Sequence, residues 1–167
     1  MKRIHIIGGL GSGKTYLSRK LGKHFNIPVL ALDDIYWDNT EWKQGIERPV
    51  KERDRQLEVF LQNENWVMEG IYYKWLTPSF EKADIIILIQ PNEWLRNFRL
   101  FKRFIQSRLG LIDEKKQSFK AFIGLLKWAQ KYAKDKIPPI LEMTEPYKDK
   151  RLSFSSADEA FDFLLKQ

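Results

Sequence analysis

The chain has 167 residues, and 43% of them are hydrophobic, which suffices for one globular domain with a sizeable core. It contains no cysteine, so the sequence excludes a disulfide framework, thiolate zinc sites and a cysteine nucleophile, and we expect any metal to bind oxygen ligands. The formal net charge of +7 at pH 7 indicates an anionic partner.

Hydrophobic runs in the chain are short. The longest aliphatic run, Ile85–Ile89, is far below the roughly 20 residues needed to cross a bilayer. The apolar stretch behind Met1 ends at Gly8 and is shorter than the ~7–15 residues of a signal-peptide core. We therefore expect a cytoplasmic protein without a membrane partner.

Aliphatic segments alternate along the chain with segments of helical periodicity, a pattern typical of a parallel sheet covered by helices. Strands are predicted at residues 3–7, 28–32, 66–69, 84–89 and 151–154. The predicted fold class is therefore α/β, a three-layer α/β/α arrangement around a five-stranded parallel sheet. We expect one domain, residues 1–167, that includes a helical lid.

Helices outside the basic part of the chain are predicted from apolar side chains that recur every three or four residues. They cover residues 14–25, 49–63 and 157–165. Pro49 suits a first helical position because its φ is fixed and it lacks an N–H. Ser156 and Glu159 have the spacing of a reciprocal cap at the start of the last helix.

Most of the positive charge lies in residues 96–136, which carry twelve Lys or Arg against three acids, a net charge of +9, while the rest of the chain is at −2. Two amphipathic helices are predicted there, at residues 92–108 and 118–134, joined by residues 110–117. We expect this segment to form the lid. Prolines at positions 138, 139 and 146 predict a loop before the last strand.

The helix at residues 92–108 has two opposite faces. One is an apolar stripe, which we expect to pack on the core: Trp94, Phe98, Phe101 and Ile105. The other carries arginines, and guanidinium groups can chelate a transferred phosphoryl group when a mobile segment closes. Arg99 and Arg103 are the first candidates, Arg96 and Arg108 the next, with residues 110–117 as the closing tip. An ordinary solvent-facing helix surface is the alternative.

The phosphate-binding pattern, glycine at the first and sixth positions followed by Lys and Thr, occurs between the first strand and the first helix. Glycines let backbone amides surround an anion, and the helix N-terminus adds partial positive charge. The nucleotide is expected to contact Gly8, Gly9, Leu10, Gly11, Ser12, Gly13, Lys14, Thr15 and Tyr16. Lys14 would reach the β- and γ-phosphates, and Thr15 would ligate Mg²⁺. The alternative is a glycine-rich turn with a solvent lysine.

A magnesium nucleotide site usually has a carboxylate where a neighbouring strand ends. Asp33 follows the second predicted strand, and we assign it to the acceptor hydroxyl or phosphate and to metal-bound water. Glu69 ends the third strand and is assigned to the water shell of Mg²⁺. Asp34 stays an alternative to Asp33, and each acid could instead be only a cap or turn residue.

Aromatic residues crowd the loops after the second and third strands: Tyr36, Trp37, Trp42, Tyr72, Tyr73 and Trp75. Their flat faces would stack on a base or sugar at little entropic cost, so we predict an acceptor pocket here, with core packing as the alternative. His5 and His24 have no metal-binding partner at useful spacing, and we interpret both as structural.

Several segments together resemble the bacterial DNA topology modulation protein family, a branch of the adenylate-kinase-like P-loop kinases. They are residues 8–15, the more particular Leu32-Asp33-Asp34-Ile35-Tyr36-Trp37, residues 66–70 and the arginine helix. The resemblance covers nearly the whole chain and implies a five-stranded parallel sheet of the P-loop nucleoside- or nucleotide-kinase type with a helical lid that bears the arginines. It also implies ATP as donor, Asp33 as the matching acid, and a loop at Ser155 and Ser156 beside the adenine. Glu69-Gly70-Ile71-Tyr72 stands where the family tends to have Asp-Gly-Asn-Tyr, and the Gly-Phe-Pro-Arg element of adenylate kinases proper is missing.

We therefore expect an ATP- and Mg²⁺-dependent small-molecule kinase that phosphorylates a nucleotide, a nucleoside or a similar small acceptor. The catalytic residues would be Lys14, Asp33, Arg99 and Arg103, the metal ligands Thr15, Glu69 and Asp33, and Ser155 would contact the nucleotide. The basic segment keeps two alternatives open: a nucleic-acid-binding regulator or weak NTPase, and a module that binds ATP without transfer. The kinase is preferred because no recognised DNA-reading motif appears. The sequence does not show the acceptor or the oligomeric state.

Overall fold

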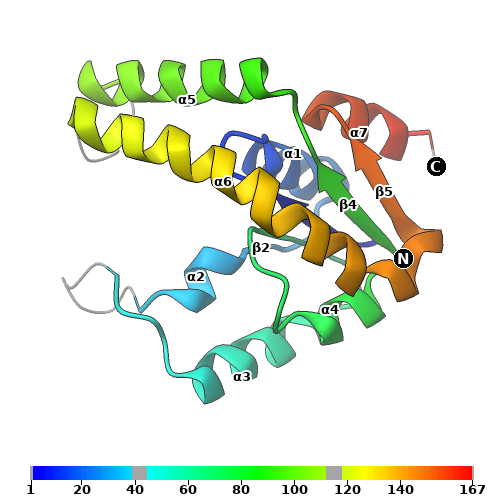
Figure 1. Cartoon of the computed structure of the whole chain (residues 1–167). Coiled ribbons are helices and arrows are strands. Elements are labelled where there is room, and N and C mark those ends of the chain that lie inside the picture. The colour runs from blue at the N-terminus through cyan, green and yellow to red at the C-terminus, as the bar shows by residue number, and fades with distance from the viewer. Residues whose placement is uncertain (1, 39–44, 112–117, 167) are drawn as a thin grey trace.

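The structure is a computed structural model that describes residues 2–38, 45–111 and 118–166. Five parallel strands form one sheet in the order β2-β3-β1-β4-β5 (Figure 1). They are β1 (Arg3–Gly8), β2 (Val29–Ala31), β3 (Trp66–Gly70), β4 (Ile85–Ile89) and β5 (Arg151–Phe154). The predicted five-stranded parallel sheet is thereby confirmed, and every strand end lies within one residue of its predicted position.

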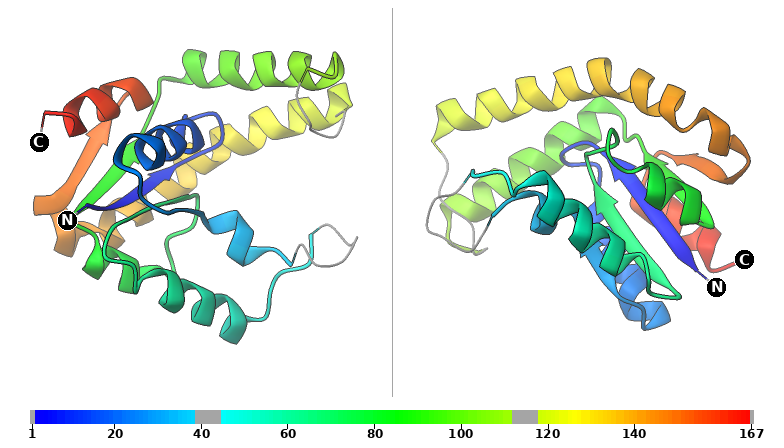
Figure 2. Two further views of the ribbon diagram at one scale, coloured as in Figure 1. Left: turned by 180° about the vertical axis from the view of Figure 1, so that it is seen from behind. Right: turned by 90° about the horizontal axis from the view of Figure 1, so that it is seen from below.

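The described helices cover both faces of this sheet. They are α1 (Lys14–Phe25), α2 (Leu32–Tyr36), α3 (Val50–Phe60), α4 (Thr77–Lys82), α5 (Glu93–Arg108), α6 (Phe119–Met143), the 3₁₀ helix η1 (Glu145–Lys150) and α7 (Ala157–Leu164). Figure 2 shows α1 and α7 on one side and α3 and α4 on the other. The predicted α/β/α layering is therefore confirmed.

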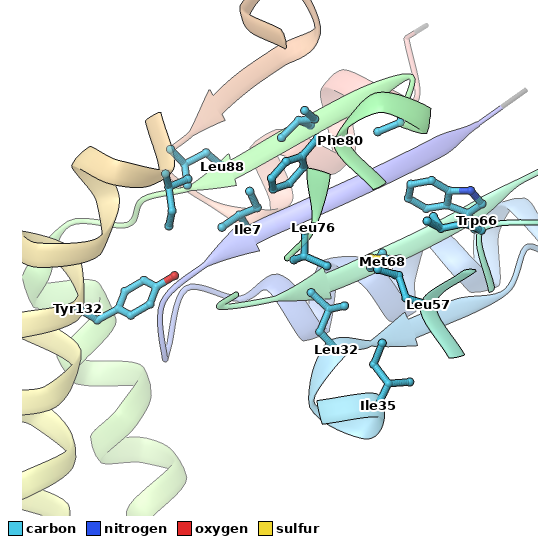
Figure 3. Packing of buried hydrophobic residues seen from close by; sticks show 14 residues of the cluster. Ile7, Leu32, Ile35, Leu57, Trp66, Met68, Leu76, Phe80, Leu88 and Tyr132 are labelled. Atoms are coloured by element: carbon cyan, nitrogen blue, oxygen red, sulfur yellow. The ribbon is translucent and has the colours of Figure 1, made fainter. Parts of the chain in front are cut away.

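Two hydrophobic cores hold the three layers together. On one face, side chains of β1 and β3 such as Ile7 and Met68 pack with Leu57 of α3 and Phe80 of α4 (Figure 3). On the other face, Ile4 and Ile6 of β1 pack against α1 and α7. Since both faces are covered, β4 can be aliphatic throughout instead of alternating with polar residues.

Helix α5 buries the opposite face from the one that we predicted. The side chains of Trp94, Phe98, Phe101 and Ile105 are 73%, 51%, 48% and 38% exposed. The buried residues of α5 are Arg96, Leu100 and Ser107. Periodicity shows that a helix has two faces, but contacts elsewhere in the chain decide which one is buried. Here Arg96 and Leu100 pack so closely on Gly11 that an added Cβ would lie 3.1 Å from Leu100.

Helix α6 also differs from the prediction, because it continues through Pro138 and Pro139, where a loop was expected. The carbonyls four residues before these prolines lose their helical donors, but they belong to the exposed Lys134 and Asp135 and can bind water. Only Pro146 lies beyond the helix, in η1.

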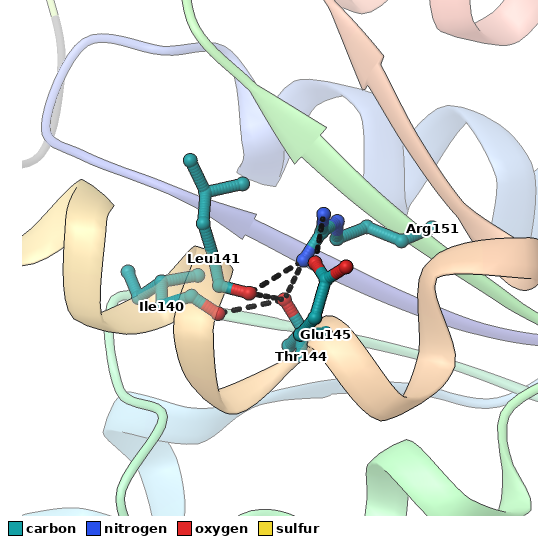
Figure 4. Close-up of polar contacts among 5 residues, drawn as sticks. All are labelled: Ile140, Leu141, Thr144, Glu145 and Arg151. Carbon is teal, nitrogen blue, oxygen red and sulfur yellow. Dashed lines mark hydrogen bonds and ion pairs between the residues drawn. The ribbon is translucent and has the colours of Figure 1, made fainter.

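Side-chain contacts to β5 hold the C-terminal end of α6 (Figure 4). Arg151 Nη1 donates to the Leu141 carbonyl at 2.6 Å and to Thr144 Oγ1 at 2.9 Å. Thr144 Oγ1 in turn donates to the Ile140 carbonyl at 2.6 Å. These hydrogen bonds satisfy carbonyls in the last turn of the helix.

Smaller differences concern helix ends and short helices. Pro49 is the residue before α3 and not its first residue. Ser156 Oγ accepts a hydrogen bond from the Glu159 amide as predicted. The Glu159 carboxylate accepts from the Ser155 hydroxyl at 2.7 Å and the Ser155 amide at 3.0 Å, and the Ser156 amide makes a smaller contribution. The short helices α2 and α4 were not predicted. In the described parts of the chain, no helix has the length and apolarity needed to span a bilayer.

Candidate functional site

Residues 8–15 cover the end of β1, a loop at residues 9–13 and the start of α1, the strand–loop–helix arrangement that their pattern predicts. Gly11 and Gly13 have φ angles of 71° and 98°, a backbone region that side chains disfavour, so glycine is required at both positions. The loop closes through hydrogen bonds from the Ser12 amide to the Gly9 carbonyl at 3.3 Å and from the Leu17 amide to the Gly13 carbonyl at 2.9 Å. Turns of this kind, with glycines in the left-handed region, can direct backbone amides toward an anion.

Lys14, Thr15 and Glu69 meet at the carboxyl ends of β1 and β3. These strands are adjacent and parallel, and Ile6 is paired with Glu69. Thr15 Oγ1 donates to Glu69 Oε1 at 2.8 Å, and Lys14 Nζ lies 3.8 Å from Glu69 Oε2. Lys14 and Glu69 are only 9% and 4% exposed. Burial raises the pKa of Glu69, and the charge of Lys14 and the Thr15 hydroxyl oppose this shift.

Asp33 lies in the first turn of α2 and accepts a hydrogen bond from the Tyr72 hydroxyl at 2.8 Å. Its negative charge is near enough to contribute to the raised pKa of Glu69. Burial and the Asp33 carboxylate raise the pKa of Tyr72, so the phenol keeps its proton and donates it. Asp34 is the next residue of α2, exposed like Asp33, but the bond to Tyr72 belongs to Asp33.

The donor set fits a magnesium ion that is bound together with a phosphate ligand. The Thr15 hydroxyl and the Glu69 carboxylate supply hard oxygen ligands, which Mg²⁺ prefers. Within the described residues, no group of three or more His, Cys, Asp or Glu could hold a metal ion. Phosphate oxygens of a bound substrate and water molecules would therefore complete the coordination, as is usual for Mg²⁺.

The arginines of α5 lie at different distances from the loop. Arg99 Nη1 donates to the Ser12 carbonyl at 2.9 Å, and the same nitrogen lies 3.3 Å from the position that a Cβ of Gly13 would occupy. Arg103 borders a groove together with Thr15 and Tyr16. Arg96 is buried and pairs with Glu93 at 3.4 Å. Arg108 is exposed and lies about 13 Å further along the helix than Arg99, by helical rise.

Four of the six predicted aromatic residues line one cavity of about 290 Å³: Tyr36, Tyr72, Tyr73 and Trp75. The rings of Tyr36 and Tyr72 stack at a centroid distance of 4.4 Å, and Tyr36 and Trp75 stack at 6.5 Å. Trp37 packs edge-on against Tyr36 and does not line the cavity. Trp42, like residues 112–117 of the predicted closing tip, lies outside the described residues.

Tyr132 of α6 was not predicted as a site residue, although it connects the loop to the cavity. Its hydroxyl donates to the Ile71 carbonyl at 2.7 Å, and its ring lies 3.0 Å from where a Cβ of Gly9 would be. Burial raises the pKa of Tyr132. On α6, Tyr132 is buried, whereas its neighbour Ala133 is exposed. Trp128 and Arg53 also line the cavity and were missed.

Ser155 and Tyr16 lie near the start of α7. Ala157, two residues after Ser155, lies 3.2 Å from where a Cβ of Gly13 would be. The Ser155 hydroxyl donates to Glu159 Oε2 at 2.7 Å, and the Tyr16 hydroxyl donates to Asp158 at 3.1 Å. Ser155 and Tyr16, which are expected to contact the nucleotide, therefore lie near the Gly13 end of the loop.

His5 is a core residue. It is fully buried, its Nδ1 lies 2.8 Å from Ser79 Oγ, and burial lowers its pKa to about 3. This environment agrees with a structural role. His24 is exposed on α1 and packs edge-on against Phe25 and Phe161.

The strand order, the phosphate loop and the helices on both faces define the P-loop kinase fold. A shikimate kinase from Bacteroides thetaiotaomicron has this fold, with a TM-score of 0.55 and 16% identity over 99% of both chains. The chain is 30% identical over 132 residues to the uncharacterized protein YqaC of Bacillus subtilis (strain 168), a match that covers 78% of this chain and 72% of YqaC. It belongs to the same family as YqaC.

No family model matches the chain. A tRNA dimethylallyltransferase of Mycoplasmoides gallisepticum is 27% identical over 92 residues, which are 54% of this chain but only 28% of the transferase. The chain therefore matches only a minor part of that enzyme.

Proposed function

We propose that the protein is an ATP- and Mg²⁺-dependent phosphotransferase that acts on a small acceptor. The observation that carries this proposal is the convergence of Lys14, Thr15 and Glu69 beside a loop whose two positive-φ glycines shape it for an anion. A buried lysine, a hydroxyl and a carboxylate at this point match the needs of a triphosphate and its metal ion. The P-loop kinase fold of the chain supports the same assignment.

Each residue has a distinct part in this proposal. The loop amides and Lys14 bind the phosphates, and Thr15 and Glu69 hold the Mg²⁺, which neutralises charge on the phosphates when bound. The γ-phosphoryl group is transferred from ATP to an acceptor oxygen, and ADP is the leaving group. Asp33 accepts the proton that a hydroxyl acceptor loses. Asp33 also contacts the metal indirectly, through a metal-bound water molecule. Arg99 and Arg103 bind the charge that spreads over the transferred group.

The same proposal includes the lid and the acceptor side. The described parts of the basic segment, residues 96–111 and 118–136, act as the lid within a single domain, and Ser155 and Tyr16 contact the donor nucleotide. The acceptor binds beside Tyr72, whose hydroxyl holds Asp33. We place the protein in the cytoplasm and compare it with the DNA topology modulation proteins, whose Leu-Asp-x-x-Tyr-Trp segment it shares.

ATP consumption with a panel of nucleosides, nucleotides and sugars tests the proposal. At least one acceptor should raise ATP turnover above the rate without acceptor, and Lys14→Ala should abolish the increase. Lys82→Ala, which changes a lysine at the end of α4, is the matched control. Unchanged turnover in Lys14→Ala would refute the assignment.

A second candidate function is nucleic-acid binding, and one specific observation favours it. A groove of about 670 Å³ between α1 and α5 is bordered by Arg19, Lys20, Lys23 and Arg103, and no carboxylate borders it among the residues that the structure describes. Lys20 already pairs with Asp158 at 3.0 Å, which weakens this groove as a phosphate track. Titrations with DNA and RNA at rising salt test it, because several phosphate contacts give a steep loss of affinity.

A further inference from the structure

The cavity of about 290 Å³ beside Asp33 has aromatic walls from two separate parts of the chain. One wall is the stack of Tyr36 and Tyr72 with Trp75, from α2 and the loop after β3. The other is the pair Trp128 and Tyr132 of α6, whose rings are 5.4 Å apart and inclined by 28°. Flat faces on two sides favour a planar ligand over a puckered one.

The charged side chains that line this cavity are all cationic within the described parts of the chain: Arg53, Lys74 and Lys136. Arg53 is already engaged, since it pairs with Asp54 at 2.7 Å and its guanidinium lies 4.2 Å above the Trp75 ring. It therefore serves as part of the wall.

The two lysines differ from Arg53. Lys74, in the loop after β3, and Lys136, on α6, form no hydrogen bond or ion pair with any described residue. Both are exposed and border the same cavity, although they are 62 positions apart in the sequence. Among the described residues that line the cavity, none is a carboxylate that could balance these two charges.

We propose that the cavity selects an acceptor with a planar ring that carries a negatively charged group, either a carboxylate or a phosphate. The ring would lie against Tyr36, Tyr72 and Trp75, and the charge would lie within reach of Lys74 and Lys136. The term acceptor rests on the proposed function, because Tyr72 links this cavity to Asp33 through its hydroxyl. The binding preference itself rests only on the rings and the lysines.

Matched pairs of probes that differ by one charged group test this preference by calorimetry. Nicotinate against nicotinamide tests a carboxylate, and AMP against adenosine tests a phosphate. Shikimate, a carboxylate on a puckered ring, tests planarity. Each probe is titrated into protein saturated with Mg²⁺ and the non-hydrolysable analogue AMP-PNP, which occupies the phosphate loop, and into protein without the analogue.

At least one charged probe should bind about fivefold or more tightly than its uncharged partner and than shikimate. Lys74→Gln and Lys136→Gln should each weaken the charged probe about two- to fivefold and leave the uncharged one unchanged, as for exposed ion pairs. Lys127→Gln, which removes one charge from α6 outside the cavity, is the matched control and should change neither.

The outcomes separate this inference from the proposed function. Equal binding of charged and uncharged probes, equal binding of shikimate, or no binding of any probe would overturn the inference, even if AMP-PNP binds. Failure of AMP-PNP to bind would overturn the proposed function, while selective binding of a planar anion would still support the inference. If only nicotinate or only AMP binds, the result identifies the charged group as carboxylate or phosphate.

Discussion

The hydroxyl of Thr15 donates a hydrogen bond of 2.8 Å to the carboxylate of Glu69, and this bond joins the first turn of α1 to the end of β3. The two groups are the oxygen ligands that we assign to Mg²⁺. The carboxylate also lies 3.8 Å from Lys14 Nζ, so it balances the buried lysine in this structure. Binding of a metal–phosphate complex would have to replace these contacts with new ones.

Removal of the Thr15 hydroxyl should therefore weaken metal-dependent binding. Thr15→Val keeps the shape of the side chain, and we expect it to reduce the affinity for Mg²⁺-ATP at least about tenfold. Thr15→Ser keeps the hydroxyl and should restore most of the affinity. Calorimetric titration of both variants at several Mg²⁺ concentrations measures the effect, and equal affinities for the two variants would contradict the metal assignment.

Arg99 is the α5 arginine in direct contact with the loop, through its bond of 2.9 Å to the Ser12 carbonyl. If it stabilises the transferred group, Arg99→Met should lower turnover about 100-fold, and it should lower ATP affinity much less. Lys102→Met, on the exposed part of the same helix, serves as the control. Steady-state kinetics with the best acceptor separate the two effects. A variant that loses ATP affinity but keeps its turnover at saturation would show that Arg99 only holds the loop.

Gly13 has a φ of 98°, and an added Cβ would lie 3.2 Å from the Ala157 Cβ. Gly13→Ala should lower the free energy of unfolding by about 1–2 kcal/mol, because the left-handed region costs an L-residue roughly this much. Gly124→Ala in α6, where an added Cβ meets no atom within 4 Å, should instead raise stability by up to about 1 kcal/mol. Urea denaturation of both variants measures this contrast, and similar effects in the two would count against the loop conformation.

The sequence predicts the sheet well because strand signals are local. The aliphatic run of β4 and the segment of β5 are recognisable without knowledge of the rest of the chain. The orientation of α5 is not local: its apolar stripe repeats with helical period, but only the contact of Arg96 and Leu100 with Gly11 decides which side is buried. Similarly, proline predicts a break at positions 138 and 139, but exposed carbonyls and the contacts of Arg151 at the helix end allow α6 to continue.

For the candidate site, the motif predicts the loop and its neighbouring acid, because P-loop chemistry requires these residue types at fixed spacing. The cavity walls depend on distant contacts. Tyr132 and Trp128 come from a helix whose charge pattern suggested only a basic surface, and nothing in the local sequence shows that they approach Ile71 and Gly9. Only the structure shows such contacts between residues that are far apart in the sequence.

His5 should make the protein sensitive to acid. Its pKa is about 3 when folded and near 6.5 when unfolded, so the unfolded state binds more protons below pH 6.5, and stability falls as the pH decreases from 6.5 toward 3. This residue alone should remove about 2 kcal/mol between pH 7 and pH 5. His5→Phe should lack this loss, whereas His24→Asn, at an exposed position, should keep it. Urea denaturation at both pH values gives the difference, and an equal loss in His5→Phe would refute this origin.

In the proposed function, the loop at residues 8–15 binds the triphosphate of a magnesium nucleotide. Calorimetric titration of the protein with Mg²⁺-AMP-PNP measures this binding, with Lys14→Ala and Lys82→Ala titrated in parallel. One nucleotide should bind per chain, and binding should be retained in Lys82→Ala and lost or weakened at least about tenfold in Lys14→Ala. Absence of binding to the unaltered protein, or equal affinity in Lys14→Ala, would contradict the proposed function.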